Sequence, residues 1–185
     1  MINETLKDAE EKMAKATEVT REEFTTIRAG RANAALFSKI MVEYYGTPTP
    51  LQQVASIQTP EPRVAVVTPF DKSALGAIER AIRDSDLGVN PSNDGAIIRV
   101  PFPQLTEDRR KEFIKVAKTK AEDARIAIRN IRRNAKEALE KMAKDGDAGK
   151  DDVARGEKAL EDLTTKAVGH IDDMLKHKEA ELLEV

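Results

Sequence analysis

The chain has 185 residues, of which 40% are hydrophobic and 35% charged, so it can bury a core beneath a heavily charged surface. It has no cysteine, which excludes a disulfide framework, a thiolate nucleophile and a cysteine-ligated metal. The net charge is -2, the N-terminus is charged, and no stretch approaches the roughly 20 apolar residues of a membrane span, so we expect a cytoplasmic protein without membrane contact.

The first 30 residues predict one long amphipathic helix. Apolar or small side chains recur at steps of mostly three and four, which places them on one face. These positions are Ile2, Leu6, Ala9, Met13, Ala16, Thr20, Phe24 and Ile27. We expect the helix to end near Ala29 and Gly30, because glycine accepts the left-handed conformation that often follows a helix.

The middle of the chain predicts a small α/β module instead. All eight prolines lie between Pro48 and Pro103, and proline breaks helix interiors. Alternating or β-branched runs predict strands at residues 39–45, 54–57, 64–67 and 96–100. Asp71 or Ser73 can cap a short helix that follows.

Two further long helices follow the module. Thr106 is the expected N-cap of the first, which should run roughly 60 Å at 1.5 Å per residue. Its apolar positions are Phe113, Ala117, Ala121, Ala124, Ile128, Ile131, Ala135, Ala138 and Met142. Asp145 to Gly149 has the composition of a turn. The last helix should bury Val153, Leu160, Leu163, Ala167, Ile171, Met174 and Leu182.

The predicted fold class is therefore α+β. Residues 1–30 and 105–185 should form an elongated three-helix bundle, and residues 31–104 an inserted α/β domain with a mixed sheet plus helix. Two short links join the parts, and we expect a hinge there. The expected hinge residues are Gly30, Arg31, Pro101, Phe102, Pro103 and Gln104.

A row of cations marks the helix that follows Thr106. Residues 105–145 contain 13 basic and 8 acidic side chains, whereas residues 146–185 contain 6 and 11. The row consists of Lys118, Arg125, Arg129, Arg132, Arg133 and Lys136. Its members recur at helical spacing, about a quarter turn from the apolar face, and arginine binds phosphate oxygens in pairs. The row predicts a surface for an RNA backbone.

Two other interpretations of the row stay open. A solvated helix face with i,i+4 ion pairs is common. Only Glu122, however, stands clearly among the six cations, and Arg129 has Arg125 and Arg133 at its i±4 positions, which suggests an external anion. A coiled-coil scaffold that docks an acidic protein surface is the alternative function. Because no aromatic residue follows Phe113, base stacking is not expected on this helix.

The sequence offers no enzyme site. His170 and His177 lie on one helix without a closed set of metal ligands. No nucleophile, base and orienting group stand out, so we expect no catalytic residue, no metal and no cofactor.

Several strings, in order along nearly the whole chain, resemble the bacterial ribosome recycling factor family. They are IRAGR at 27–31, VEYYGTPTPL at 42–51, DLGVNP at 86–91, IRVP at 98–101, LTEDRRK at 105–111, and a run from Val116 that reaches IRNIRR at 128–133.

The resemblance implies an L-shaped monomer whose outline is similar to transfer RNA. It implies binding to the large ribosomal subunit and its ribosomal RNA, and action with elongation factor G and GTP to split post-termination ribosomes. It also implies RNA contacts at Arg28, Arg129 and Arg132. To these we add Arg31, Arg109, Arg110, Arg125 and Arg133 as candidate contacts.

Overall fold

The computed structural model describes residues 1–184 and divides into two compact units. The four α-helices longer than one turn are α1 (Ile2–Thr25), α3 (Leu75–Arg83), α4 (Glu107–Lys144) and α5 (Lys150–Leu183). The strands are β1 (Met41–Tyr44), β2 (Thr47–Pro50), β3 (Ala55–Glu61), β4 (Val64–Pro69), β5 (Ser92–Asn93) and β6 (Ile98–Pro101). Short helical turns are η1 (Ala34–Phe37), α2 (Leu51–Val54) and η2 (Lys72–Ala74).

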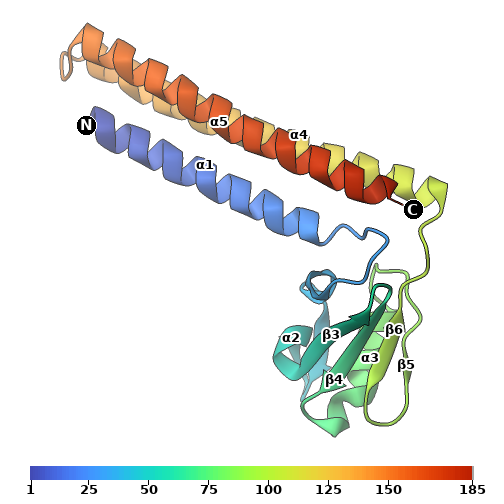
Figure 1. Cartoon of the computed structure of the whole chain (residues 1–185). Coiled ribbons are helices and arrows are strands. Elements are labelled where there is room, and N and C mark those ends of the chain that lie inside the picture. The colour runs from blue at the N-terminus through green and yellow to red at the C-terminus, as the bar shows by residue number, and fades with distance from the viewer. Residues whose placement is uncertain (185) are drawn as a thin grey trace. The chain divides into compact units, whose positions relative to one another are not determined.

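The first unit, here called the helical unit, contains Met1–Phe24 and Lys115–Glu179. In it, long segments of α1, α4 and α5 run alongside one another (Figure 1). Each buries one stripe, as the apolar spacing predicts. The buried residues include Ala9, Met13, Ala117, Ala121, Ala124, Ile128, Ala135, Leu139, Val153, Leu160, Ala167 and Ile171. The three-helix bundle expected from the sequence is thus confirmed.

Small side chains let these helices approach closely. Gly156 is buried, and a Cβ atom on it would lie 3.0 Å from Ile2 Cγ2 and 3.5 Å from Leu139 Cδ1. The buried hydroxyls of Thr17 and Thr164 donate to carbonyls one turn back in their own helices. These two buried hydroxyls are therefore satisfied within their own helices.

The predicted helix ends are partly right. Thr106 caps α4, because its Oγ1 accepts a hydrogen bond from the Arg109 backbone N–H at 3.2 Å. The turn after α4 is also confirmed, with Gly146 at φ +76°. The predicted end of α1 was wrong: the helix stops at Thr25, and Gly30 is not left-handed. Ile27, which the apolar spacing placed on the buried face, is buried at 5% exposed although it lies beyond the helix end.

The second unit, here called the sheet unit, contains Thr25–Ile114 together with residues from Ala180 onward. One sheet has the order β3-β4-β6-β5, and β1 pairs with β2 in a separate hairpin. Helix α3 packs against β1 and is preceded by η2, whose N-cap is Asp71. The larger fully buried side chains here are Phe37, Val42, Leu51, Val67, Ile78, Ile82 and Ile98.

The fold class predicted from the sequence is confirmed, with one difference of detail. Every strand pairing is antiparallel, whereas a mixed sheet was expected. Strand β2 was missed because it contains Pro48 and Pro50. Proline is tolerated there because β2 pairs on one side only.

Candidate nucleic-acid interface

The eight predicted RNA contacts separate into two groups of four. Arg28, Arg31, Arg109 and Arg110 belong to the sheet unit. The other four, here called the arginine row, lie on α4 within the helical unit and are Arg125, Arg129, Arg132 and Arg133. Each group has its own surroundings.

Arg125 is the most enclosed member of the arginine row. Its side chain is 19% exposed, and its Nε and Nη2 lie 2.8 and 2.7 Å from Oδ1 of Asp172 on α5. Its Nη1 also donates to Glu122 at 3.0 Å. Burial lowers the pKa of the Arg125 guanidinium, but hydrogen bonds to these two carboxylates outweigh it, so the pKa lies above its ordinary value. Arg125 thus ties α4 to α5.

Arg129 and Arg132 line a shared groove of about 410 Å³ between α4 and α5. Arg132 Nη1 donates to Glu161 of α5 at 3.2 Å, and its buried Nε has no hydrogen-bond partner. Arg129 is 54% exposed, and its Nη1 forms a longer ion pair with Glu122 Oε1, at 3.7 Å. The remaining lining residues are Glu161, Thr164, Thr165, Val168, Gly169 and Asp172. The groove therefore presents cations and carboxylates together.

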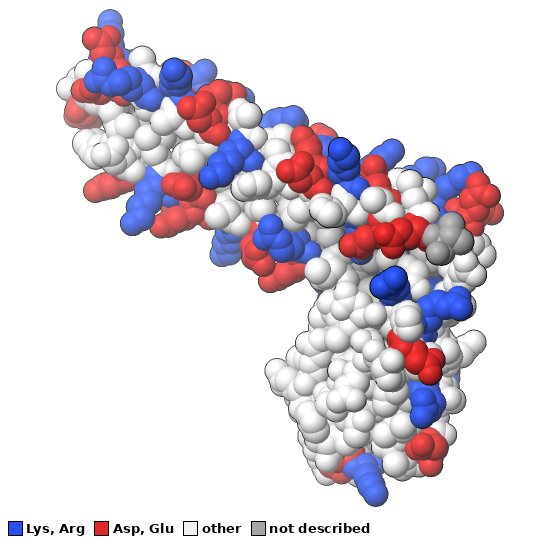
Figure 2. Space-filling view, viewed as in Figure 1, with Lys and Arg blue, Asp and Glu red and all other residues white. Residues whose placement is uncertain are grey.

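The row has acidic partners that spacing within its own helix does not provide. They are Asp172 and Glu161, both on α5. They lie 47 and 29 positions from their arginines, so no spacing within α4 could show them. Basic and acidic side chains accordingly intermingle over the helical unit in Figure 2. Only the acidic excess of the last 40 residues hinted at this pairing.

Arg133 completes the row as an exposed residue whose guanidinium donates to the Asn130 side chain. It makes no salt bridge within residues 1–184. Arg129 and Arg133 are therefore the members most available to an external anion.

In the sheet unit, Arg28 is almost completely buried at 6% exposed. Its Nη2 donates to the Pro103 carbonyl, and its guanidinium carbon lies 5.4 Å from the centre of the Phe102 ring. Burial, and then repulsion from Arg109, lower the pKa of the Arg28 guanidinium. The sequence did not indicate this burial.

The other three arginines of the sheet unit lie nearer solvent. Arg109 pairs with Glu112 at 3.2 Å and lies over the Phe113 ring at 5.2 Å. Arg31 is exposed and Arg110 is half-buried. They remain candidate RNA contacts.

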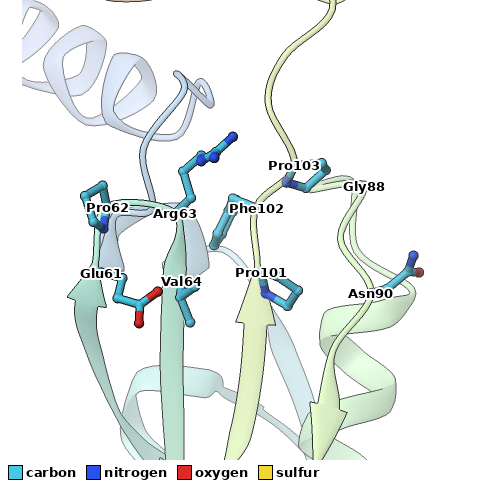
Figure 3. A pocket seen from close by; sticks show the side chains of 9 residues that line it. All are labelled: Glu61, Pro62, Arg63, Val64, Gly88, Asn90, Pro101, Phe102 and Pro103. Carbon is cyan, nitrogen blue, oxygen red and sulfur yellow. The ribbon is translucent and has the colours of Figure 1, made fainter.

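Phe102 of the predicted hinge, and Ala32 directly after its first segment, are hydrogen-bonded to the β3–β4 turn. Ala32 N–H donates to Pro62 O at 2.6 Å, and Phe102 N–H donates to Arg63 O at 2.7 Å. Phe102, 2% exposed, lies edge-on to Phe37 in the sheet unit's core. A hollow of about 630 Å³ borders this region. Figure 3 shows its lining side chains on the β3–β4 turn, the end of β6 and the loop after α3.

Gly30 and the exposed Arg31, Pro103 and Gln104 make up the rest of the predicted hinge, and Pro101 ends β6. Pro101 pairs with Val64, and the Pro103 carbonyl accepts a hydrogen bond from Arg28, so exposure does not free either position from contacts.

Among residues 1–184, no three His, Cys, Asp or Glu side chains are grouped as a metal site requires, and both histidines are exposed. Within the same residues, no helix is long and apolar enough to cross a membrane.

Comparison with known proteins decides the family. The sequence model of the family "Ribosome recycling factor" matches residues 20–183. The chain belongs to the ribosome recycling factor family. A ribosome-recycling factor of Streptomyces coelicolor is 64% identical over 185 residues, and one of Acidothermus cellulolyticus is 65% identical over 185. Both alignments cover all of this chain and all of the relative.

Solved structures of ribosome recycling factors share the fold. A solution structure of the ribosome recycling factor has a TM-score of 0.79 and 37% identity, covering 100% of this chain and 98% of that one. The T. thermophilus ribosome recycling factor, placed with E. coli elongation factor G on the E. coli post-termination complex, gives a TM-score of 0.69 and 41% identity over both full chains.

For a ribosome recycling factor, the three RNA contacts implied by the resemblance thus have unlike surroundings. Arg129 and Arg132 line one groove, whereas Arg28 is packed against a ring and a carbonyl of its own unit.

Proposed function

We propose that this chain recycles ribosomes in the cytoplasm. It binds the large subunit of the post-termination ribosome and, with elongation factor G and GTP hydrolysis by that factor, splits the ribosome into subunits, freeing messenger and transfer RNA. The observation that carries the proposal is the family match over residues 20–183, with relatives aligned from end to end. The relative placed with elongation factor G on a post-termination complex supports the same partners.

The chain itself carries out no chemical step in this proposal. The arginine row anchors the helical unit to ribosomal RNA, mainly through phosphates, because arginine forks match phosphate oxygens. Arg129 and Arg132 are the principal anchors, since they face a common groove. Energy comes from the nucleotide cycle of elongation factor G.

Movement within the chain is the second part of the proposal. Residues 1–30 with 105–185, and residues 31–104, act as two domains whose relative orientation changes at Gly30, Arg31 and residues 101–104. The exposed positions Arg31 and Gln104 take up most of that change, because the backbone N–H groups of Ala32 and Phe102 are bonded to the β3–β4 turn and the Pro103 carbonyl accepts from Arg28.

Sedimentation of post-termination ribosomes tests the function directly. Purified chain, elongation factor G and GTP should convert the ribosomes to subunits, whereas Arg132→Ala should lower the rate at least about tenfold if the anchor supplies one charge-assisted phosphate contact. Circular dichroism must show that the variant stays folded. Failure of the unaltered chain to bind or split ribosomes would overturn the proposal.

Two further readouts separate the alternatives. Association that survives ribonuclease treatment and high salt would favour the protein scaffold instead of RNA binding. The same sedimentation assay tests the hinge: a cross-link between residues 31–104 and the helical bundle should abolish splitting but spare ribosome binding. Full activity of the locked chain would remove the hinge from the proposal.

A further inference from the structure

The two carboxylates that α5 places in the groove are unexpected on a surface that meets RNA. Glu161 and Asp172 are 61% and 54% exposed, and both line the groove with Arg129 and Arg132. Phosphates repel carboxylates, so charge alone would disfavour acids here. Their presence calls for a role that outweighs this repulsion.

Asp172 begins a connected chain of ion pairs that ends at Arg129. It binds Arg125 through two nitrogens at 2.7 and 2.8 Å, and Arg125 in turn holds Glu122 at 3.0 Å. The other oxygen of Glu122, Oε1, lies 3.7 Å from Arg129 Nη1. Because Arg125 uses Nε and Nη2 on a single carboxylate oxygen, its plane is fixed relative to α5. That fixed plane in turn limits where Glu122 and Arg129 lie.

Glu161 acts on Arg132 without an intermediate. Its Oε2 accepts from Arg132 Nη1 at 3.2 Å, and Arg132 Nε is buried without a partner. Among residues 1–184, Glu161 is the acid that forms a salt bridge with Arg132. The carboxylate therefore sets the direction of this guanidinium.

We propose that Glu161 and Asp172 are positioning residues of the RNA-binding face: Glu161 orients Arg132 directly, and Asp172 orients Arg129 through Arg125 and Glu122. The inference rests on the proposed function, since the face must bind ribosomal RNA for orientation to matter. Long side chains held in one geometry lose less conformational freedom when a phosphate arrives. The RNA-binding face is then built by α4 and α5 together.

The sign of one substitution distinguishes orientation from charge. Asp172→Asn removes a negative charge near RNA, so repulsion alone predicts tighter binding, whereas loss of orientation predicts weaker binding. Asp173→Asn is the matched control. The substitution removes the same negative charge from an exposed neighbouring residue that makes no salt bridge to the arginine row within residues 1–184. Affinity for purified bacterial large ribosomal subunits is measured for both variants by sedimentation.

We expect Asp172→Asn to weaken binding about threefold to tenfold, in the lower part of the range of coupling found for residues of one salt-bridge network. Glu161→Gln should weaken binding to large subunits similarly. Its matched control is Asp162→Asn, at an exposed neighbouring residue. Asp173→Asn and Asp162→Asn should leave affinity unchanged or slightly raised. Equal affinities of Asp172→Asn and Asp173→Asn, or tighter binding by Asp172→Asn, would overturn the inference.

Three further readouts exclude a purely structural role. Asp172→Glu should recover most of the affinity, because it restores a carboxylate for Arg125. A lost phosphate contact should reduce the slope of log K against log salt by about one in Asp172→Asn, but not in the control. All variants must show by circular dichroism that they are folded at the assay temperature; weak binding by Asp172→Asn that tracks only unfolding would count against positioning.

Failure of this inference differs from failure of the proposed function. If the unaltered chain does not bind large subunits, the function itself is wrong. If the unaltered chain binds large subunits and Asp172→Asn binds them equally tightly, only the positioning role is lost.

Discussion

The paired arginines of the helical unit and Arg28 of the sheet unit have opposite surroundings. Along α4, Arg125 and Arg132 remain partly exposed and meet carboxylates at 2.7 to 3.2 Å. In the sheet unit, Arg28 is 6% exposed and meets a carbonyl and an aromatic ring, with no salt bridge within residues 1–184. The carboxylate of Asp71, in contrast, binds the hydroxyls of the two tyrosines.

The difference separates two uses of the same side chain. A paired, partly exposed arginine is oriented and can still reach a ligand, whereas a buried arginine without a carboxylate contributes through packing and one hydrogen bond. Arginine at a position that resembles a family RNA contact can therefore serve either purpose. Three sets of substitutions follow, each confined to one unit.

The largest effect is expected at Arg28. Arg28→Ala should lower the free energy of unfolding of the sheet unit by about 2 kcal/mol, because it removes a hydrogen bond, a ring contact and buried volume. Arg28→Met should cost less, since it keeps volume over Phe102 and removes a charge that lacks a carboxylate. Tyrosine fluorescence during urea unfolding reports on this unit, because both tyrosines lie in it and tryptophan is absent.

The matched control is Arg31→Ala, an exposed neighbour that should stay within about 0.5 kcal/mol of the unaltered chain. Equal losses at Arg28 and Arg31 would contradict the packing role of Arg28.

A smaller effect is expected at Arg125. Arg125→Ala should destabilise the helical unit by about 1 kcal/mol, because its side chain is only 19% exposed and bridges two carboxylates. Arg129→Ala, at a side chain 54% exposed, should cost under about 0.5 kcal/mol yet weaken ribosome binding. Thermal unfolding followed by far-ultraviolet circular dichroism measures both, and a larger stability loss for Arg129→Ala would reverse the distinction.

The smallest effect is a pH dependence in the sheet unit. Hydrogen bonds from the Ser73 side chain and backbone, and from Tyr45 and Tyr44, hold the pKa of Asp71 below its ordinary value of 3.8. Because folding lowers this pKa, Asp71 stabilises the folded unit above about pH 3.8, and that contribution is lost as the pH falls toward the folded-state pKa. Asp71→Asn should make tyrosine-detected stability less sensitive to acid; an unchanged profile would exclude the contribution.

Much of the local structure could be predicted because its causes lie within a few residues. The cap at Thr106, the turn around Gly146, the cap at Asp71 and the apolar stripes follow from local propensity and periodicity. Strand β2 was not predicted, because proline argues against a strand except at a sheet edge. The end of α1 was predicted four to five residues too late, because the apolar spacing continues to Ile27 and Gly30 follows it, whereas the helix stops at Thr25.

The sequence by itself determined three long helices, an inserted sheet module, the family, and the row of arginines along α4. Only the tertiary structure decided which of those arginines are paired, because Asp172 and Glu161 reach them across 47 and 29 positions of chain. It also decided that Arg28 is buried against Pro103, 75 positions away. Periodicity tells which face of a helix is polar, but the register between helices, set by packing of the whole core, tells which charges meet.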